Sequence, residues 1–295
     1  MNKRTPLLGA HMSIAGGLEK SVQRARQATC DCVQVFTKNN NQWRAKKLGE
    51  EESARFQSAL EEENITAPIA HTSYLINLAS PDDALWKKSI DAFVEELQRI
   101  EKLGIPFLVQ HPGAFTTSSE EAGLQRIVEA LDEAICQTTD LSAGCLLENT
   151  AGQGSNLGWK FEHLAWILDH VHDPDRFGIC IDTCHAYAAG YPLDTRKEYL
   201  ATIRQINQTI GTKSIKAFHL NDSKRELGSR VDRHDHIGQG HLGLEPFRHL
   251  LNDRRFRRIP MYLETPKGTD PDTGEDWDQM NLRILRSLVD SSGGR

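Results

Sequence analysis

The residues with the clearest chemical potential in this sequence are histidines and carboxylates that stand at the ends of short apolar runs. Seven lie at or just after such ends, and a polar segment supplies two more. The nine are His71, His111, Glu148, Asp182, His185, His219, Asp232, His234 and Glu264. Imidazole nitrogens and carboxylate oxygens are ligands that suit Zn²⁺. Nine ligands exceed what one tetrahedral ion can use, whereas three ions that share bridging groups would use them all.

Two short motifs, Asp182-Thr-Cys-His185 and Asp232-Arg-His234, each place two of these ligands close together. A single histidine at a strand end is commonly only hydrogen-bonded or half-exposed, so the inference depends on the whole set. The remaining histidines are expected to play other roles. These are His11 as a supporting partner of the site, His163, His170, His172 and His249 as surface or structural residues, and His236 and His241 as solvated loop residues.

The elements that must position these residues follow an alternating pattern. Continuously apolar runs, typical of parallel strands covered on both faces, are separated by longer stretches of helical period. The expected strands are Leu7–Ser13, Val33–Lys38, Pro68–Ser73, Phe107–Gly113, Cys145–Thr150, Gly178–His185, Ile215–Asp222 and Met261–Pro266. Between them, amphipathic helices are expected over Glu50–Asn64, over Asp82–Leu103 and from a capping signal at Ser118–Glu121 through Cys136.

Eight strands that alternate with helices predict an α/β fold, the (β/α)₈ TIM barrel. In such a barrel the carboxyl ends of all strands meet on one face, so the nine side chains would converge at a single mouth. We expect residues 1–295 to form a single catalytic domain with a long βα insertion at about residues 223–243 and a frayed tail at residues 291–295.

Composition is compatible with this architecture and excludes several classes of protein. No apolar run approaches the roughly 20 residues needed to span a bilayer, and no secretory signal precedes the first strand. We therefore expect a cytoplasmic protein whose six cysteines are reduced and buried. The net charge of −6 does not exclude a nucleic-acid substrate, because three Zn²⁺ ions would offset it and local charge matters more.

Several segments together resemble endonuclease IV, the metal-dependent apurinic/apyrimidinic endonuclease family, along essentially the whole chain. The matching segments are Gly9–Gly17, His71–Leu78, Gln110–Gly113, Leu147–Gly152, Ile181–His185, His219–Ser223, Asp232–His234 and Leu263–Pro266. The resemblance implies cleavage of duplex DNA on the 5′ side of abasic sites, which leaves a 3′-hydroxyl and a 5′-deoxyribose phosphate. It also implies removal of groups that block 3′ ends.

The resemblance further implies how three zinc ions would be held. The three groups are His71, His111 and Glu148; Asp182, His219 and Glu264, with Glu148 bridging to the first; and His185, Asp232 and His234. A bridging pair of zinc ions would lower the pKa of water and supply the nucleophile at neutral pH. Glu148, which would also orient that nucleophile, and Glu264 are the expected catalytic carboxylates.

DNA recognition is expected from loops at the same mouth. The loop Lys38–Arg44 and the pair Tyr74-Leu75 match family segments that enter the minor groove, where an apolar wedge fills the gap left by a flipped nucleotide. Simple packing of Tyr74-Leu75 at the barrel mouth is the alternative. The expected DNA-binding residues are Asn39, Asn41, Gln42, Arg44, Tyr74, Leu75 and Arg233, with further cations at Lys46, Lys224, Arg225 and Arg230.

One departure from the family concerns Asn41, which stands where some members carry arginine, so a cationic wedge at that point is in doubt. Two rival functions also remain open at this stage. Sugar isomerases and epimerases of similar barrel type place histidines and carboxylates around one or two divalent ions, and a non-enzymatic DNA- or metal-binding barrel is a third class. The expected partner is duplex DNA with abasic sites or blocked 3′ ends, bound by a monomer without membrane contact.

Overall fold

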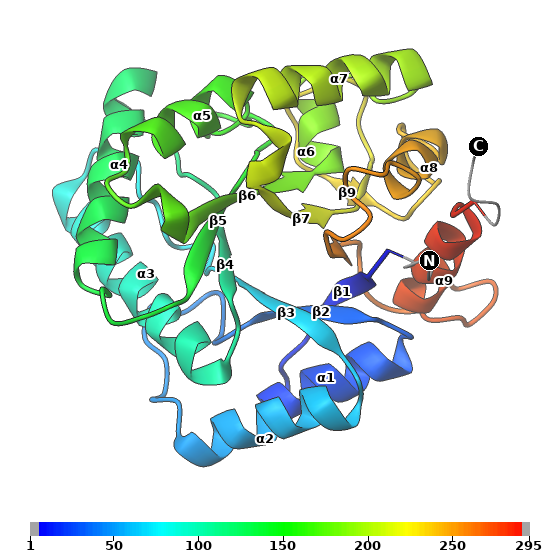
Figure 1. The fold of residues 1–295 in the computed structure, drawn as a ribbon, viewed down its shortest axis with the longest axis horizontal. Coiled ribbons are helices and arrows are strands. Elements are labelled where there is room, and N and C mark those ends of the chain that lie inside the picture. The colour runs from blue at the N-terminus through cyan, green and yellow to red at the C-terminus, as the bar shows by residue number, and fades with distance from the viewer. Residues whose placement is uncertain (1–5, 291–295) are drawn as a thin grey trace.

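Eight strands close into a parallel barrel, as the alternating pattern predicts. The computed structural model describes residues 6–290, so the expected frayed tail lies outside the described residues. The barrel strands are β1 (Leu8–Met12), β2 (Cys32–Phe36), β3 (Thr66–His71), β4 (Phe107–Gln110), β5 (Gly144–Glu148), β6 (Phe177–Asp182), β7 (Ile215–His219) and β10 (Met261–Leu263). Their order around the barrel is β1-β10-β7-β6-β5-β4-β3-β2, and every neighbouring pair is parallel (Figure 1).

Helices surround the barrel on its outside (Figure 1). The α-helices are α1 (Leu18–Gln27), α2 (Glu50–Glu62), α3 (Asp83–Leu103), α4 (Glu120–Cys136), α5 (Phe161–His170), α6 (Thr183–Ala188), α7 (Arg196–Thr209), α8 (Glu245–Leu251) and α9 (Trp277–Ser287), with 3₁₀ turns at Pro174–Arg176 and Thr212–Ser214. None of these helices, within the described residues, is long and apolar enough to cross a membrane.

Helix boundaries follow local capping chemistry. The Asp82 carboxylate accepts a hydrogen bond from the Leu85 amide at 2.8 Å, so Asp82 caps α3 instead of forming its first turn. Ser119 caps α4 in the same way through the Ala122 amide at 3.2 Å. Gly104 ends α3 with a left-handed φ of 69°, a conformation that costs glycine little.

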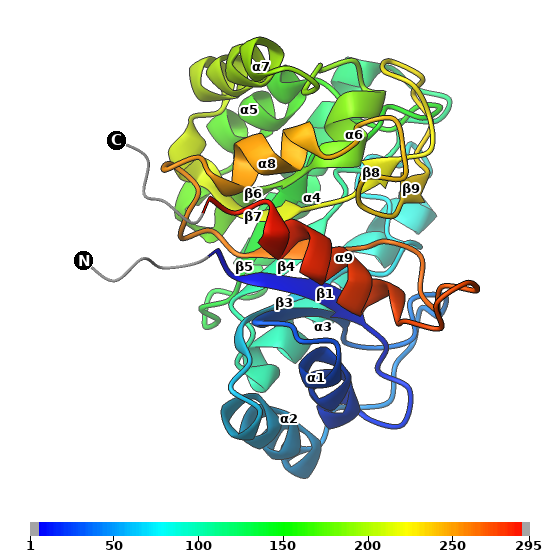
Figure 2. The same ribbon diagram turned by 90° about the vertical axis from the view of Figure 1, so that its right-hand side faces the viewer.

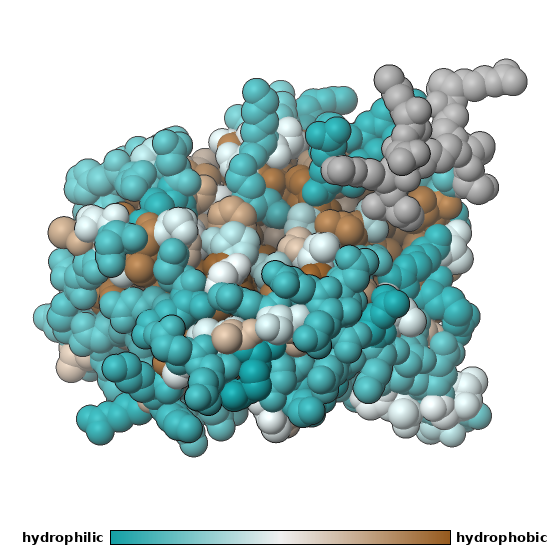
Figure 3. Space-filling model, turned by 60° about the horizontal axis from the view of Figure 1, so that its bottom comes forward, coloured by the Kyte–Doolittle hydropathy of each residue, from teal (hydrophilic) through white to brown (hydrophobic). Residues whose placement is uncertain are grey.

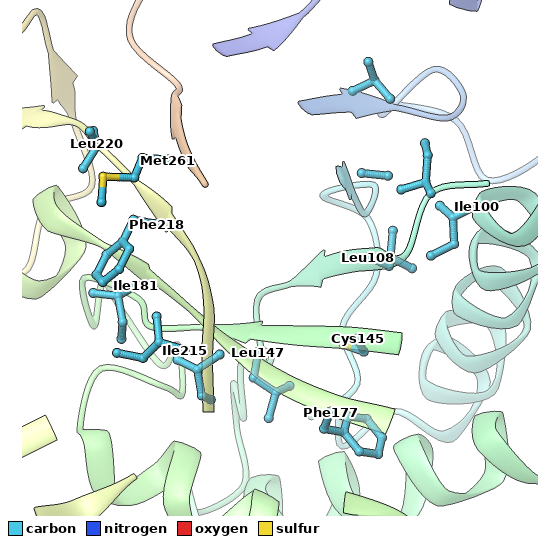
Figure 4. Packing of buried hydrophobic residues seen from close by; sticks show 14 of the residues in the cluster. Ile100, Leu108, Cys145, Leu147, Phe177, Ile181, Ile215, Phe218, Leu220 and Met261 are labelled. Atoms are coloured by element: carbon cyan, nitrogen blue, oxygen red, sulfur yellow. The ribbon is translucent and has the colours of Figure 1, made fainter. Parts of the chain in front are cut away.

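The hydrophobic core has two layers. The larger layer packs the outer faces of the strands against the helices; Ile181, Phe218 and Met261 are among its buried side chains (Figure 4). The smaller layer fills the inside of the barrel with Cys32, Ile69, Val109, Leu146, Cys180, Ala217 and Tyr262. The barrel is therefore a packed solid below its mouth, and the polar site can only be built at the strand ends.

The segment after β7 contains more structure than the loop that its composition predicts. β8 (Asp222–Ser223) and β9 (His234–Asp235) form an antiparallel hairpin, which lies beside α6 at one end of the barrel (Figure 2). The buried Asp222 carboxylate accepts hydrogen bonds from four backbone amides, those of Ser223, Gly238, Gly240 and Leu242. This one carboxylate thus pins both ends of the insertion together.

Two expectations about individual residues are wrong. Cys136, at the end of α4, is exposed, whereas the other five cysteines are buried and all six are free thiols. His236 is not solvated, because its ring stacks on Trp277 with centroids 3.8 Å apart and its side chain is buried. The face of the molecule in Figure 3 is mostly hydrophilic, with apolar side chains confined to small areas between polar ones.

Candidate metal centre

The barrel brings all nine candidate ligands to its mouth. His71, Glu148, Asp182 and His219 are the last residues of their strands, and His111 and Glu264 directly follow β4 and β10. His185 lies in α6, and the insertion delivers Asp232 and His234. Within the described residues these side chains form three groups whose ligand atoms lie within 4.8 Å of one another: His71, His111 and Glu148; Glu148, Asp182, His219 and Glu264; and His185, Asp232 and His234.

The first group is centred on one oxygen of Glu148. Its Oε2 lies 3.2 Å from Nε2 of His71 and 3.1 Å from Nε2 of His111. Nδ1 of His71 is 2.9 Å from the Thr72 carbonyl oxygen, so that nitrogen carries the proton and donates it. This hydrogen bond leaves Nε2 of His71 free to bind a metal ion.

The second group uses the other oxygen of Glu148. Nδ1 of His219 lies 2.9 Å from Oε1 of Glu148 and 3.2 Å from Oε2 of Glu264. Asp182 is next to them, with Oδ2 at 3.9 Å from the same nitrogen. Glu148 therefore faces both groups at once, as a carboxylate that bridges two ions must.

The third group is assembled from α6 and the insertion. Nε2 of His185 lies 3.1 Å from Oδ2 of Asp232, and Nε2 of His234 lies 3.3 Å from Oδ1 of the same carboxylate. Asp182 caps α6 by accepting the His185 amide at 2.8 Å, which turns His185 into the mouth. The β8–β9 hairpin, in which Ser223 pairs with His234, holds His234 on the other side of this group.

The charges of this cluster favour a cation. Burial opposes ionisation of Glu148 and Glu264, but His219 and the neighbouring histidines more than offset it, so the pKa of each carboxyl lies well below its ordinary value. Burial also opposes ionisation of Asp232, and His185 lowers its pKa in the same way. Ionised carboxylates buried at the barrel mouth need positive charge, and the nitrogen and oxygen donors fit Zn²⁺.

Sequence reasoning missed several residues that support these ligands. Gln34, on β2, accepts a hydrogen bond from Nε2 of His219 at 2.8 Å and donates to Oε1 of Glu264 at 2.5 Å. Asn221 donates to Asp182 at 2.6 Å and accepts the Glu264 amide at 2.8 Å. For Asn221 the available signal was an amide two residues after the ligand His219, whereas Gln34 has no such local signal. His11, expected as a supporting residue, lies 3.5 Å from Glu264.

A fourth, overlapping group joins Asp182 and His234 to Cys184, which sequence reasoning did not nominate. Burial raises the pKa of the Cys184 thiol to about 12. Its Sγ is 3.7 Å from the Arg233 carbonyl oxygen, to which the thiol donates a weak hydrogen bond. Burial thus disfavours the thiolate of Cys184, which is the form of cysteine that binds metals and acts as a nucleophile.

The expected DNA-reading loops border this centre. Asn39, Asn41, Gln42 and Arg44 are exposed in the loop after β2. Lys38 is not part of that exposed surface, because its Nζ donates to the Trp43 carbonyl oxygen at 3.0 Å and lies 3.6 Å from Glu96. Lys38 therefore holds the backbone of the loop through a buried side chain and is unavailable to contact phosphate.

Tyr74 stands between two cavities at the mouth. One, of about 260 Å³, is lined by His71, His111 and Asn77, and the other, of about 680 Å³, by Phe36, Asn39–Asn41 and Glu264. Tyr74 is 63% exposed, and its ring packs edge-on against that of Phe36 with centroids 5.5 Å apart. Leu75 is half-buried. Tyr74 thus contacts Phe36 at the mouth and leaves most of its surface exposed to solvent.

The expected cations near the mouth are also exposed; they are Lys46, Lys224, Arg225, Arg230 and Arg233. Two of them make internal contacts. Arg233 donates to the Asp232 carbonyl oxygen at 2.8 Å, and the Arg230 guanidinium lies over the Trp159 ring at 4.0 Å from its centre. Lys224 lies 4.0 Å from Asp235, a weak surface pair.

Known proteins resemble this chain over nearly its whole length. A family model described as a xylose isomerase-like TIM barrel matches residues 22–288. The probable endonuclease 4 of Chloroflexus aggregans is 50% identical over 284 residues, which cover 96% of this chain and 98% of that protein. The probable endonuclease 4 of Trichlorobacter lovleyi is 50% identical over 281 residues, with 95% and 99% covered.

Solved structures give the same picture. Endonuclease IV from Thermus thermophilus superimposes with a TM-score of 0.84 at 33% identity, covering 96% of this chain and 98% of that one. A D-tagatose 3-epimerase-like protein superimposes with a TM-score of 0.73 at 18% identity, covering 96% of each chain. The latter likeness concerns the fold alone.

Proposed function

The chain belongs to the endonuclease IV family, and from this we propose that it is a DNA-repair enzyme that hydrolyses the phosphodiester bond 5′ to abasic sites in duplex DNA. The products are a 3′-hydroxyl and a 5′-deoxyribose phosphate, and the same site removes groups that block 3′ ends. We further propose that the enzyme acts as a cytoplasmic monomer whose single barrel domain carries the activity.

The observation that carries the proposal is the sharing of Glu148 between two ligand groups, with a third group beside them. Oε2 of Glu148 faces His71 and His111, and Oε1 faces His219. All nine ligands proposed from the sequence fall into these three groups. This arrangement supports three zinc ions per chain.

Zinc ions held by these groups would supply positive charge to the phosphate oxygens. They would also lower the pKa of water enough for hydroxide to be available at neutral pH. The residues of the chain do the remaining work. Glu148, whose side chain is wholly shielded from solvent, orients the attacking water in line with the phosphorus. Glu264, held by Gln34, is the second catalytic carboxylate. No serine or cysteine nucleophile is required.

Recognition of damage is proposed to use the two loops beside this centre. Tyr74, which is exposed and lines both mouth cavities, fills the space that a flipped abasic nucleotide leaves in the duplex, together with the half-buried Leu75. Asn39, Asn41, Gln42 and Arg44 contact the minor groove from the neighbouring loop. Arg233 contacts backbone phosphate from the insertion.

The testing experiment is incision of a duplex oligonucleotide with one abasic site, before and after prolonged chelation, alongside metal analysis of the same sample. Incision on the 5′ side, about three zinc ions per chain and loss of incision on chelation would support the proposal. A folded, metal-loaded protein that leaves the abasic strand intact would contradict it.

The alternative function of a sugar isomerase or epimerase rests on the shared barrel, and no feature of the site favours it. The third ligand group and the exposed cations of the insertion have no evident use in handling a small sugar. Such enzymes work with one or two divalent ions, so metal stoichiometry separates the two functions.

A further inference from the structure

The insertion that carries Asp232 is fixed to the rest of the mouth by three side chains outside the ligand groups. The Arg230 guanidinium lies 4.0 Å from the centre of the Trp159 ring, a cation–π contact. The Asp232 amide donates a hydrogen bond to Oε1 of Gln153 at 3.1 Å. Gln153 and Trp159 both belong to the connection between β5 and α5, which starts directly after Glu148.

The backbone of the same segment is tied to α6. The Gly228 amide donates to the Tyr187 carbonyl oxygen at 3.1 Å, and the Arg230 amide donates to that of Ala188 at 2.9 Å. Arg230 has a φ of 53°, in the left-handed region that side chains other than glycine rarely adopt. Such a conformation is unfavourable and persists only where surrounding contacts hold it in place. Here those contacts are the Trp159 ring and the hydrogen bond to Ala188.

Asp232 depends on these anchors more than the other ligands do. Its side chain is 40% exposed, whereas those of Glu148 and Asp182 are fully buried. Within the described part of the chain, its carboxylate pairs only with His185 and His234, the two other members of its group. The position of its backbone therefore decides whether the carboxylate reaches them.

We propose that Trp159, Arg230 and Gln153 form a clamp that positions Asp232 and thereby sets the metal affinity of the third ligand group. The proposal rests on the proposed function, in which that group holds a zinc ion. It assigns to Arg230 a positioning role in addition to any contact with phosphate. Groups that orient a metal ligand typically change metal affinity by about 10–100-fold when they are removed.

The test measures zinc binding to the full chain in a series of buffered free-zinc concentrations. In Arg230→Ala and Gln153→Ala we expect two equivalents to bind as in the wild type and the third to bind about 10–100-fold more weakly. Arg230→Lys keeps a cation for the ring and is expected to recover part of the affinity. Glu226→Ala, an exposed side chain of the same segment, is the matched control and should retain three equivalents.

The outcomes separate the alternatives. Three zinc equivalents of wild-type affinity in Arg230→Ala and Gln153→Ala, with weaker binding to duplex DNA alone, would overturn the clamp and leave Arg230 as a phosphate contact. Loss of all three equivalents together would also overturn it, because that result indicates general disruption of the mouth. The proposed function would fail in a different way: the wild-type protein would bind three zinc ions and still not incise abasic DNA.

Discussion

Oε1 of Glu148 lies 2.9 Å from Nδ1 of His219, and both side chains are fully shielded from solvent at the ends of β5 and β7. The two residues are 71 positions apart in the chain, and they meet because β5 and β7 both lie next to β6 in the barrel. A buried carboxylate among histidines is costly unless positive charge compensates it. The contact therefore marks the part of the molecule whose alteration should have the largest functional effect.

Replacement of Glu148 by alanine is expected to abolish incision and to retain part of the affinity for DNA, because the loops proposed to read DNA do not contact this side chain. We expect kcat on an abasic duplex to fall by at least about 100-fold, the scale for loss of one well-placed electrostatic group. Glu129→Ala, on the outside of α4, is the control and should behave as wild type. Wild-type turnover by Glu148→Ala would refute the bridging role.

Tyr74→Ala is expected to raise KM for abasic DNA about 10-fold or more while zinc content stays at the wild-type level, since stacking of one ring on a base is worth roughly 1–3 kcal/mol. Tyr74→Phe keeps the ring and should stay close to wild type. Steady-state kinetics and metal analysis of the same samples check both statements. Zinc lost from Tyr74→Ala would instead identify the residue as structural.

Removal of metal should lower both activity and stability. The carboxylates of Glu148 and Asp182 are buried together, and without cations their repulsion opposes the folded state. Free zinc at about 100 times its dissociation constant would add about 2.7 kcal/mol per site to the free energy of unfolding. Thermal unfolding before chelation, after chelation and after zinc is restored measures this effect. An unchanged Tm across the three samples would count against a metal centre.

Gln34→Leu is expected to weaken zinc binding without unfolding the barrel. Gln34 accepts the proton of His219 Nε2 and so directs Nδ1 of that ring toward the second ligand group. Its loss should lower the affinity of that group by about 10–100-fold. Zinc titration of Gln34→Leu against Gln125→Leu, an exposed residue of α4, tests the effect. Equal zinc affinities in the two variants would show that His219 needs no such support.

A pH-dependent contribution to stability is expected away from the metal centre, at Asp253. Burial opposes ionisation of this carboxyl, but hydrogen bonds from Arg255 and Tyr199 more than offset it, so its pKa lies below the ordinary value. A lowered pKa in the folded state stabilises the protein above the unfolded-state pKa of about 4, and the stabilisation is lost as pH falls through the folded-state value.

Asp253→Asn should therefore reduce the free energy of unfolding at pH 7 by about 1.5–3 kcal/mol, the range for hydrogen bonds to charged groups. The difference from wild type should shrink as pH drops below about 4. Denaturant titrations at both pH values, with the exposed Asp169→Asn as control, measure it. A deficit that is the same at both pH values would mean that the charge of Asp253 is not involved.

The strands and longer helices could be predicted because each depends on a local pattern that the barrel reinforces. The run Gly178–His185 shows that the local pattern does not predict where a strand ends. The strand ends at Asp182, because its carboxylate caps a helix that begins at Thr183. A capping aspartate that directly follows an apolar strand can equally be read as a polar residue within the end of that strand.

The ligands themselves could be proposed from motifs, but Gln34, which contacts two of them, could not. Gln34 lies on a strand 185 positions before His219, and nothing local marks an amide that will face a histidine across the barrel. Lys38 resembles a free cation in the sequence because its loop is polar, yet Glu96 on α3 draws it into the interior. Such partners are set by tertiary packing.

The closing strand has a consequence for how the enzyme is made. β10 spans only Met261–Leu263, and it pairs with β1 at one side, with Leu8 opposite Met261, and with β7 at the other. On the ribosome, β1 emerges first and keeps an unpaired edge until every other barrel strand has been synthesised. Glu264 emerges at the same moment. Closure of the barrel and completion of the second ligand group are thus one late event, and a nascent chain stalled before it would expose a strand edge that invites aggregation.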